Sequence, residues 1–136
     1  MLVSTKGRYA LRIMLDLAQN STGEYVVLMD VANRQDISEK YLESIVASLS
    51  KAGLLTGLRG RGGGYRLSKS PGEYTIGEIL RATEGPLVPV SCLKTAENEC
   101  PRSADCLTLP LWQEVDRRLG SYLDSVTLED LLRGTV

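Results

Sequence analysis

The segment Arg59-Gly60-Arg61-Gly62-Gly63-Gly64 constrains the fold of this chain more than any other, because four of its six residues are glycines. Glycine weakens the interior of both helices and strands, so this segment predicts a turn. Two short segments that are typical of strands flank it, Leu54–Leu58 before and Tyr65–Leu67 after. The sequence therefore predicts a β-hairpin with a basic, glycine-rich tip.

Apolar residues at three- and four-residue spacing predict three helices before this hairpin. Ser38 is a good N-cap for the third helix, and Gly53 follows it where a left-handed residue is favoured. Ser21-Thr22-Gly23 predicts a turn after the first helix. The expected helices run from Thr5 to about Ala18, from about Met29 to Arg34, and from Ser38 to Ala52.

Two helices joined by a short turn and followed by a hairpin describe a winged helix-turn-helix, in which the second helix of the pair enters the major groove of DNA. Polar side chains near the start of that helix can reach base edges. Glycines in the wing allow a close backbone approach to DNA, and its arginines can contact phosphates. The candidate DNA-binding residues are Glu39, Lys40, Glu43, Ser44, Arg59, Arg61, Gly62 and Gly63.

The second half of the chain predicts two helical segments separated by an irregular stretch. Thr75 with Glu78 resembles a capping box for a helix to about Thr83. The residues between Pro86 and Pro110 show no helical or strand pattern, and a stretch of this length is typical of a functional loop. Apolar residues at helical spacing then predict a helix from Leu111 to Asp124, and Thr127 with Asp130 predicts a last, short, capped helix.

The net charge of −1 conceals an uneven distribution. Residues 1–70 contain ten Lys and Arg against six Asp and Glu, which gives +4. Residues 71–136 contain six against eleven, which gives −5. This division favours a first half that contacts phosphate and a second half that contacts a protein or a cofactor.

The three cysteines, Cys92, Cys100 and Cys106, all lie in the irregular stretch. An odd number of clustered thiols favours a metal or redox role over a secreted disulfide framework. The chain has no histidine, which excludes Ser-His and Cys-His nucleophile pairs, so we expect no enzyme. Charged residues near the N-terminus argue against a signal peptide, and no run approaches eighteen apolar residues, so we expect a soluble, cytoplasmic protein.

Several motifs are spread over nearly the whole chain. They are Ser4-Thr5-Lys6-Gly7-Arg8-Tyr9-Ala10, Ile37-Ser38 with Tyr41-Leu42-Glu43, Arg59 to Tyr65, Thr75-Ile76-Gly77-Glu78, Cys106-Leu107-Thr108 with Leu111-Trp112, and Val126-Thr127-Leu128-Glu129. With these motifs the chain resembles the IscR-like family of winged-helix iron-sulfur transcription regulators, the relatives of IscR, NsrR and CymR, with IscR the most similar. The resemblance implies a mainly α fold with a small β-hairpin. It divides the chain into a winged helix-turn-helix (1–85), a cluster-binding loop (86–110) and a dimerisation helix with a short terminal helix (111–136).

The resemblance further implies a homodimer, formed by the long C-terminal helix, that reads a pseudo-palindromic DNA operator. It implies that Cys92, Cys100 and Cys106 hold an iron-sulfur cluster, of the [2Fe-2S] type in IscR. Soft thiolates suit such a cluster. The expected function is therefore a transcriptional regulator, a repressor or a dual regulator, that senses cluster or redox status.

The fourth cluster ligand differs from the family pattern. The histidine ligand of IscR falls at Leu109 here, and the acidic ligand of NsrR falls at Arg8. The fourth ligand stays open between a local side chain, a residue of a partner subunit and a small exogenous ligand, and a four-iron cluster with one open iron is a further possibility. The local acidic candidates are Glu97, Glu99 and Asp105.

Three alternatives to cluster sensing stay open for the same thiols. One is a cluster-free regulator that acts as a thiol-disulfide switch. Another is a regulator whose loop docks a metabolic enzyme, as the resemblance to CymR implies. The third is zinc, which is disfavoured because structural zinc sites usually contain closely paired cysteines, and this chain has no C-x-x-C pair.

Overall fold

The computed structural model describes residues 2–20 and 23–136. The chain forms α1 (Thr5–Asn20), α2 (Leu28–Gln35), α3 (Glu39–Lys51), a hairpin of β1 (Leu55–Leu58) and β2 (Gly64–Leu67), and then a 3₁₀ turn η1 (Pro71–Glu73). It continues through α4 (Ile76–Glu84), a second 3₁₀ turn η2 (Ser91–Leu93), α5 (Leu109–Ser125) and α6 (Leu128–Arg133). The predicted mainly α fold with a small hairpin is confirmed. Of the turn predicted at 21–23, residues 21 and 22 lie outside the described residues.

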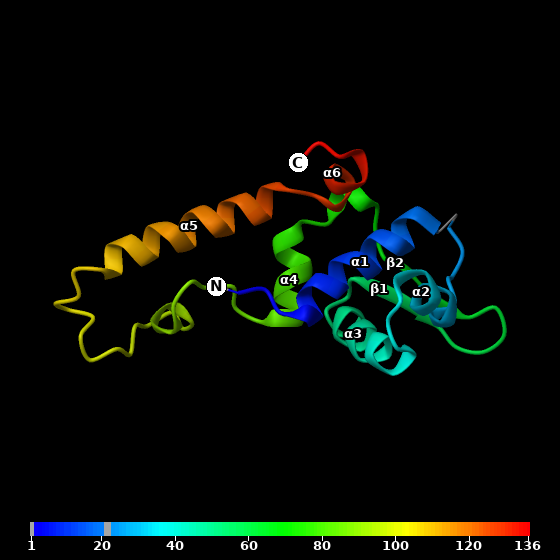
Figure 1. Ribbon diagram of the computed structural model, residues 1–136, viewed down its shortest axis with the longest axis horizontal. Helices are drawn as coiled ribbons and strands as arrows, with labels where there is room; N and C mark the ends of the chain where they lie inside the picture. The colour runs from blue at the N-terminus through cyan, green and yellow to red at the C-terminus, as the bar shows by residue number, and fades with distance from the viewer. Residues whose placement is uncertain (1, 21–22) are drawn as a thin grey trace.

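The molecule has two parts, a helical bundle that carries the hairpin and an arm formed by α5 (Figure 1). The bundle contains α1 to α4, and α6 lies against it beside η1. Residues 86–108, hereafter the cysteine loop, connect the C-terminal end of α4 to the far end of the arm. The three cysteines therefore lie away from the bundle core.

Helix α1 forms the centre of the bundle core. The predicted apolar stripe of α1 is fully buried, and so is the facing stripe of α3. Burial of each such side chain stabilises the fold by about 1.5–3 kcal/mol. The fully buried residues of these two stripes are Ala10, Ile13, Met14 and Leu17 in α1 and Leu42, Ile45, Val46 and Leu49 in α3.

Asp16 of α1 is a charged residue inside this core, with only 1% of its surface exposed. Its carboxylate accepts hydrogen bonds from the Arg34 guanidinium at 2.8 Å and from the Gln35 side-chain amide at 2.8 Å. A buried carboxylate without such partners would be strongly destabilising. The pairing therefore fixes the C-terminal end of α2 against α1, directly before the turn that leads to α3.

The base of the hairpin is held by Tyr74, which is fully buried. The Tyr74 hydroxyl donates to the Leu54 carbonyl at 2.6 Å, before β1. The same oxygen accepts from the amides of Ser68 at 2.8 Å and Lys69 at 3.1 Å, after β2. One side chain thus joins the two ends of the hairpin. At the outer edge of β2, Val26 and Tyr65 exchange two backbone hydrogen bonds of 2.8 Å.

Helix α5 begins at Leu109, two residues earlier than expected, because Pro110 lies in its first turn, where proline is tolerated. None of its residues is fully buried, and Leu111 and Tyr122 are each 56% exposed. Arg81 of α4 holds the C-terminal end of α5 through a bidentate salt bridge to Asp124, with N–O distances of 2.6 and 3.1 Å. The arm is thus attached to the bundle near one end.

Beyond the arm, the predicted capping box of Thr127 and Asp130 is present. At the start of α4, Thr75 caps the helix, but the Glu78 side chain pairs with Lys69 at 3.1 Å. No helix within the described ranges is sufficiently long and apolar to cross a bilayer.

Candidate nucleic-acid interface and cysteine loop

Helix α3 presents the polar face that the sequence predicted. The Ser38 hydroxyl accepts from the Tyr41 amide at 3.3 Å and caps the helix. Asp36, with a φ of 53°, makes the turn from α2 in the left-handed conformation that Asp tolerates better than most residues. The structure places four candidate DNA-contacting side chains together on exposed positions at the start of α3, namely Glu39, Lys40, Glu43 and Ser44.

The wing loop between β1 and β2 holds the other candidates. Gly60 and Gly62 have φ values of 89° and 76°, which favour glycine over any other residue. A Cβ at Gly63 would lie 2.2 Å from the Leu58 carbonyl oxygen, so the loop has no room for a side chain there. Arg59 and Arg61 are exposed, and they form no salt bridge within the described part of the chain. Their charges are available to an external anion.

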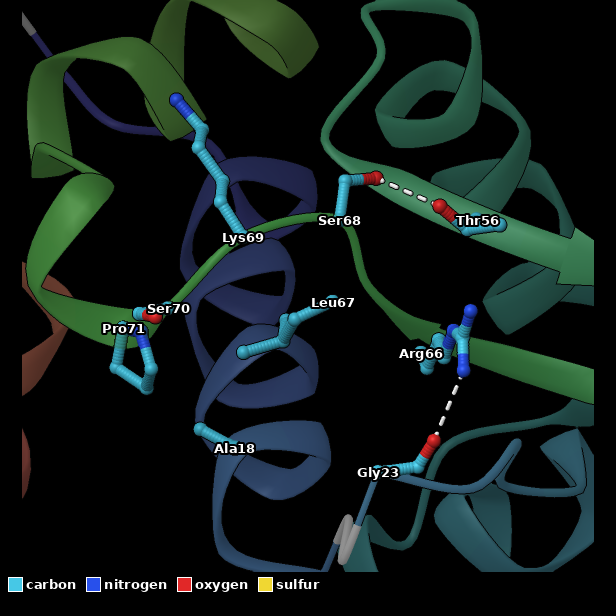
Figure 2. Close-up of a pocket in the computed structure, with 9 residues that line it drawn as sticks. All are labelled: Ala18, Gly23, Thr56, Arg66, Leu67, Ser68, Lys69, Ser70 and Pro71. Carbon is cyan, nitrogen blue, oxygen red and sulfur yellow. Dashed lines mark hydrogen bonds between the residues drawn. The ribbon is translucent and has the colours of Figure 1, made fainter.

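A hollow of about 520 Å³ lies between the hairpin and the C-terminal end of α1 (Figure 2). The Arg66 guanidinium donates to the Gly23 carbonyl at 2.9 Å and stacks over the Tyr25 ring. The Lys69 ammonium pairs with the Glu78 carboxylate of α4, at 3.1 Å. Both cations are therefore engaged within the protein, which leaves the wing arginines as the better candidates for phosphate contacts.

Lys6 is a basic residue near α3 that is not among the predicted DNA-binding residues. Its ammonium donates to the Ser48 hydroxyl of α3 at 3.0 Å. The Ser48 hydroxyl in turn donates to the Ser44 carbonyl at 3.4 Å. The first turn of α1 therefore contacts the helix that carries the candidate base-reading residues. No local pattern reveals this contact, because 42 positions separate the two partners.

The three cysteines are free thiols, each partly exposed. Cys92 lies in η2, and the Cys100 amide donates to the Asn98 side chain at 2.9 Å. Contacts with the Thr108 hydroxyl and with the backbone of Thr108 lower the pKa of Cys106 and so favour its thiolate. Smaller contributions to this shift come from the Leu109 backbone and from Arg102.

The described part of the loop does not gather these thiols into one site. Within the described ranges, no three Cys, His, Asp or Glu residues lie close enough together to hold a metal ion. The local carboxylates considered as a fourth ligand, Glu97, Glu99 and Asp105, are exposed. By donor chemistry, three thiols in a chain without histidine fit the iron of an iron-sulfur cluster. The loop would have to close to bring them together.

Residues 3–134 match the profile of the Rrf2 family, described as an iron-dependent transcriptional regulator. The curated relatives include the HTH-type transcriptional regulator IscR of Vibrio atlanticus, which is 38% identical over 98% of this chain and 76% of its own length. IscR of Cronobacter sakazakii is 39% identical over 97% of this chain and 80% of its own length.

Solved structures of similar proteins give the same result. IscR of T. potens superposes with a TM-score of 0.78 at 37% identity, covering 100% of this chain and 89% of its own. CymR, the global cysteine regulator of B. subtilis, has a TM-score of 0.76 at 40% identity, covering 96% and 95%. These comparisons confirm the IscR-like resemblance and the winged-helix fold, and they identify the relatives as regulators and not enzymes.

Proposed function

The chain belongs to the Rrf2 family of iron-dependent transcriptional regulators, and we propose that it is a DNA-binding regulator whose cysteine loop holds an iron-sulfur cluster of the [2Fe-2S] type. The observation that carries the cluster assignment is the set of three free thiols, Cys92, Cys100 and Cys106, confined to one loop of a chain without histidine. The alternative with the same fold is a regulator that senses through the thiols alone.

In this proposal α3 lies in the major groove. Lys40, Glu43 and Ser44 are exposed near its N-terminus, within reach of base edges, and Glu39 lies beside them. Arg59 and Arg61 contact phosphates, while Gly62 and Gly63 let the wing backbone approach the DNA. Both groups of candidates belong to the half of the chain with a net charge of +4.

We propose further that the protein is a homodimer joined through α5. A helix of 17 residues with no buried side chain exposes an apolar stripe that a second copy can cover. A two-fold axis through such a contact presents two copies of α3, which fits a pseudo-palindromic operator. The stripe consists of Leu111, Val115, Leu119 and Tyr122.

The three cysteines would supply three cluster ligands, and the fourth is assigned to Glu97, Glu99 or Asp105, to a partner subunit or to a small exogenous ligand. A bound cluster supplies a centre that responds to iron supply, oxidants or reactive gases. The protein's own contribution is to carry the three thiols on the loop that connects α4 to the far end of the arm. In this proposal, gain or loss of the cluster at the thiols changes the affinity of α3 for DNA, and a coupling free energy between the two sites measures the size of that change.

The test is DNA binding by cluster-loaded wild-type protein and by a variant with all three cysteines replaced by alanine. The probe is a duplex that the wild-type protein selects from a randomised library. We expect the two proteins to differ in affinity, by a factor typical of coupled sites, about 5–150-fold. Equal affinity for every selected duplex would contradict cluster sensing and leave DNA binding itself intact.

The thiol-switch alternative is supported by the contact of 3.3 Å between the Cys106 Sγ and the Thr108 hydroxyl, which lowers the pKa of Cys106 and so favours the reactive thiolate. The structure of CymR from Staphylococcus aureus in an oxidised form is also similar, with a TM-score of 0.71 at 34% identity. If iron-free protein treated with peroxide loses or gains DNA affinity, and dithiothreitol restores the original value, the switch is favoured over the cluster.

A further inference from the structure

We propose that Glu84 is a positioning residue that couples the base of the cysteine loop to the DNA-reading helix α3. This inference rests on the proposed function, since it assigns a route between the two sites named there. Glu84 is the last residue of α4, and the cysteine loop starts two residues later at Pro86. Only Gly85 separates Glu84 from the base of the loop.

The Glu84 carboxylate caps the N-terminus of α1, 77 to 80 positions away in the sequence. One of its oxygens, Oε1, accepts from the Ser4 amide at 2.9 Å, the Gly7 amide at 3.1 Å and the Ser4 hydroxyl at 2.5 Å. The first amides of a helix have no partner inside it, and the helix dipole favours a negative charge there. We call this contact of Glu84 with Ser4 and Gly7 the Glu84 cap.

The sequence around the Glu84 cap is adapted to a carboxylate from outside the helix. The first turn of α1 has no acidic residue of its own. A Cβ built on Gly7 would lie 2.2 Å from Glu84 Oε1, so the glycine leaves the space that the carboxylate occupies. Glycine is less favourable than alanine inside a helix, which makes its presence here informative.

The same turn of α1 contacts α3 through Lys6. The Lys6 ammonium donates to the Ser48 hydroxyl at 3.0 Å, and Ser48 lies one turn after the DNA-binding candidate Ser44. The following part of α1 is fixed by burial from Ala10 onward. The first turn is therefore the part of α1 that can respond to the loop base and pass a shift to α3.

The experiment uses two substitutions that break the Glu84 cap in different ways. Glu84→Ala removes the carboxylate. Gly7→Ala displaces the flexible Glu84 side chain and keeps its charge, and the helix propensity of alanine opposes the loss of stability that the broken cap causes in α1. Glu78→Gln is the matched control, because Glu78 lies on the same helix and pairs with Lys69 instead.

The measurement is the ratio of DNA affinities between cluster-loaded protein and protein freed of iron by a chelator, on the selected duplex. We expect a wild-type ratio within the usual range for a coupling, about 5–150-fold. In Glu84→Ala and Gly7→Ala this ratio should fall at least threefold, towards one. In Glu78→Gln it should stay at the wild-type value. Wild-type ratios in both cap variants would overturn the proposal. A wild-type ratio of one in protein that contains the cluster would instead overturn the proposed function, and the coupling with it.

A second readout follows α3 without DNA. In wild-type protein, we expect hydrogen exchange of the α3 amides to differ between the loaded and iron-free states. A cap that only stabilises the fold would raise exchange equally in both states when it is removed. If Glu84 couples the two sites, its removal should abolish the difference in α3 hydrogen exchange between the loaded and iron-free states. If the two cap variants keep the wild-type difference, the proposal is wrong.

Discussion

At the scale of single residues, two buried polar side chains hold the DNA-binding elements in place, one at the base of the hairpin and one at the end of α2. Tyr74 and Asp16 are almost fully buried, and their side chains bond to other segments of the chain. Neither follows from periodicity, because the pattern that places them inside does not indicate their partners. In contrast, the caps at Ser38 and Thr127 were predictable, because each bonds to an amide three residues away.

Tyr74→Phe should destabilise the protein without changing its fold. The substitution leaves the Leu54 carbonyl and the amides of Ser68 and Lys69 without their shared partner. We expect the free energy of unfolding in urea to fall by about 1–3 kcal/mol. Tyr25→Phe is the control and should be nearly neutral, because Tyr25 is partly exposed and phenylalanine keeps the ring that stacks against Arg66. Equal stability of the two variants would contradict this role of Tyr74.

Asp16→Asn tests the ion pair between the buried Asp16 carboxylate and the exposed Arg34 guanidinium, which holds α2 to α1. The neutral amide no longer balances the Arg34 guanidinium, which contacts Asp16 at 2.8 Å. Hydrogen bonds to a charged group contribute about 1.5–3 kcal/mol, and the guanidinium that is left behind is in contact with water, so we expect a loss of about 1.5–3 kcal/mol in thermal or urea unfolding. Asp36→Asn is the control, since Asp36 is exposed and asparagine also tolerates its left-handed backbone. A loss no greater than in the control would show that the pair is not needed.

At the scale of elements, the pattern of apolar and cap residues predicted most helices to within two residues, because those signals are local. The remaining differences have structural causes. Pro110 fits into the first turn of α5, so that helix starts early, and Glu78 pairs with Lys69 in place of completing a capping box. The Glu84 cap was missed, since it joins residues about 80 positions apart. A glycine in the first turn of α1 was its one local signal.

The cap of α6 should make stability depend on pH. The backbone amide and hydroxyl of Thr127 hold the pKa of Asp130 below its usual value. A carboxyl group with a lowered folded-state pKa stabilises the fold fully above its unfolded pKa, about 4, and loses that contribution as the pH falls through the folded-state value. We expect the difference in melting temperature between wild type and Asp130→Asn to shrink below about pH 4. A difference that stays constant with pH would contradict the assignment.

The wing predicts a change in the salt dependence of DNA binding. The slope of log affinity against log salt concentration is negative for a protein that binds phosphates. If Arg59 and Arg61 each bind a phosphate, replacing either one by alanine should reduce the magnitude of this slope by about 0.9. Fluorescence anisotropy at several salt concentrations measures this slope. Arg133→Ala on α6 is the control, because its side chain already pairs with Glu129. Unchanged slopes in both wing variants would place the wing away from the DNA.

At the scale of the whole molecule, the arm determines the predicted assembly. Leu119→Glu puts a charge into the apolar stripe of α5, and we expect it to convert a dimer into a monomer. Light scattering after size-exclusion chromatography gives the mass directly. Gln113→Glu adds the same charge at an exposed position off the stripe and should leave the dimer unchanged. A Leu119→Glu protein that remains dimeric would place the contact elsewhere.

The positions of the three cysteines relative to one another are the part of the whole molecule that the sequence predicts least. Spacing along the chain identified the three thiols as a set, and donor chemistry favours iron. The distances between thiols depend on how a long loop without regular structure closes, which neither helical nor strand periodicity encodes. The fourth ligand is open for the same reason.

The central claim is that the three thiols hold an iron-sulfur cluster. It is tested most directly by visible absorption and Mössbauer spectra of protein purified without oxygen, with iron, zinc and acid-labile sulfide measured per chain. We predict sulfur-to-iron charge-transfer bands, matching amounts of iron and sulfide, and the loss of both when Cys92, Cys100 and Cys106 are replaced by alanine. A colourless protein that cannot be reconstituted with iron and sulfide would contradict the claim and favour the thiol switch.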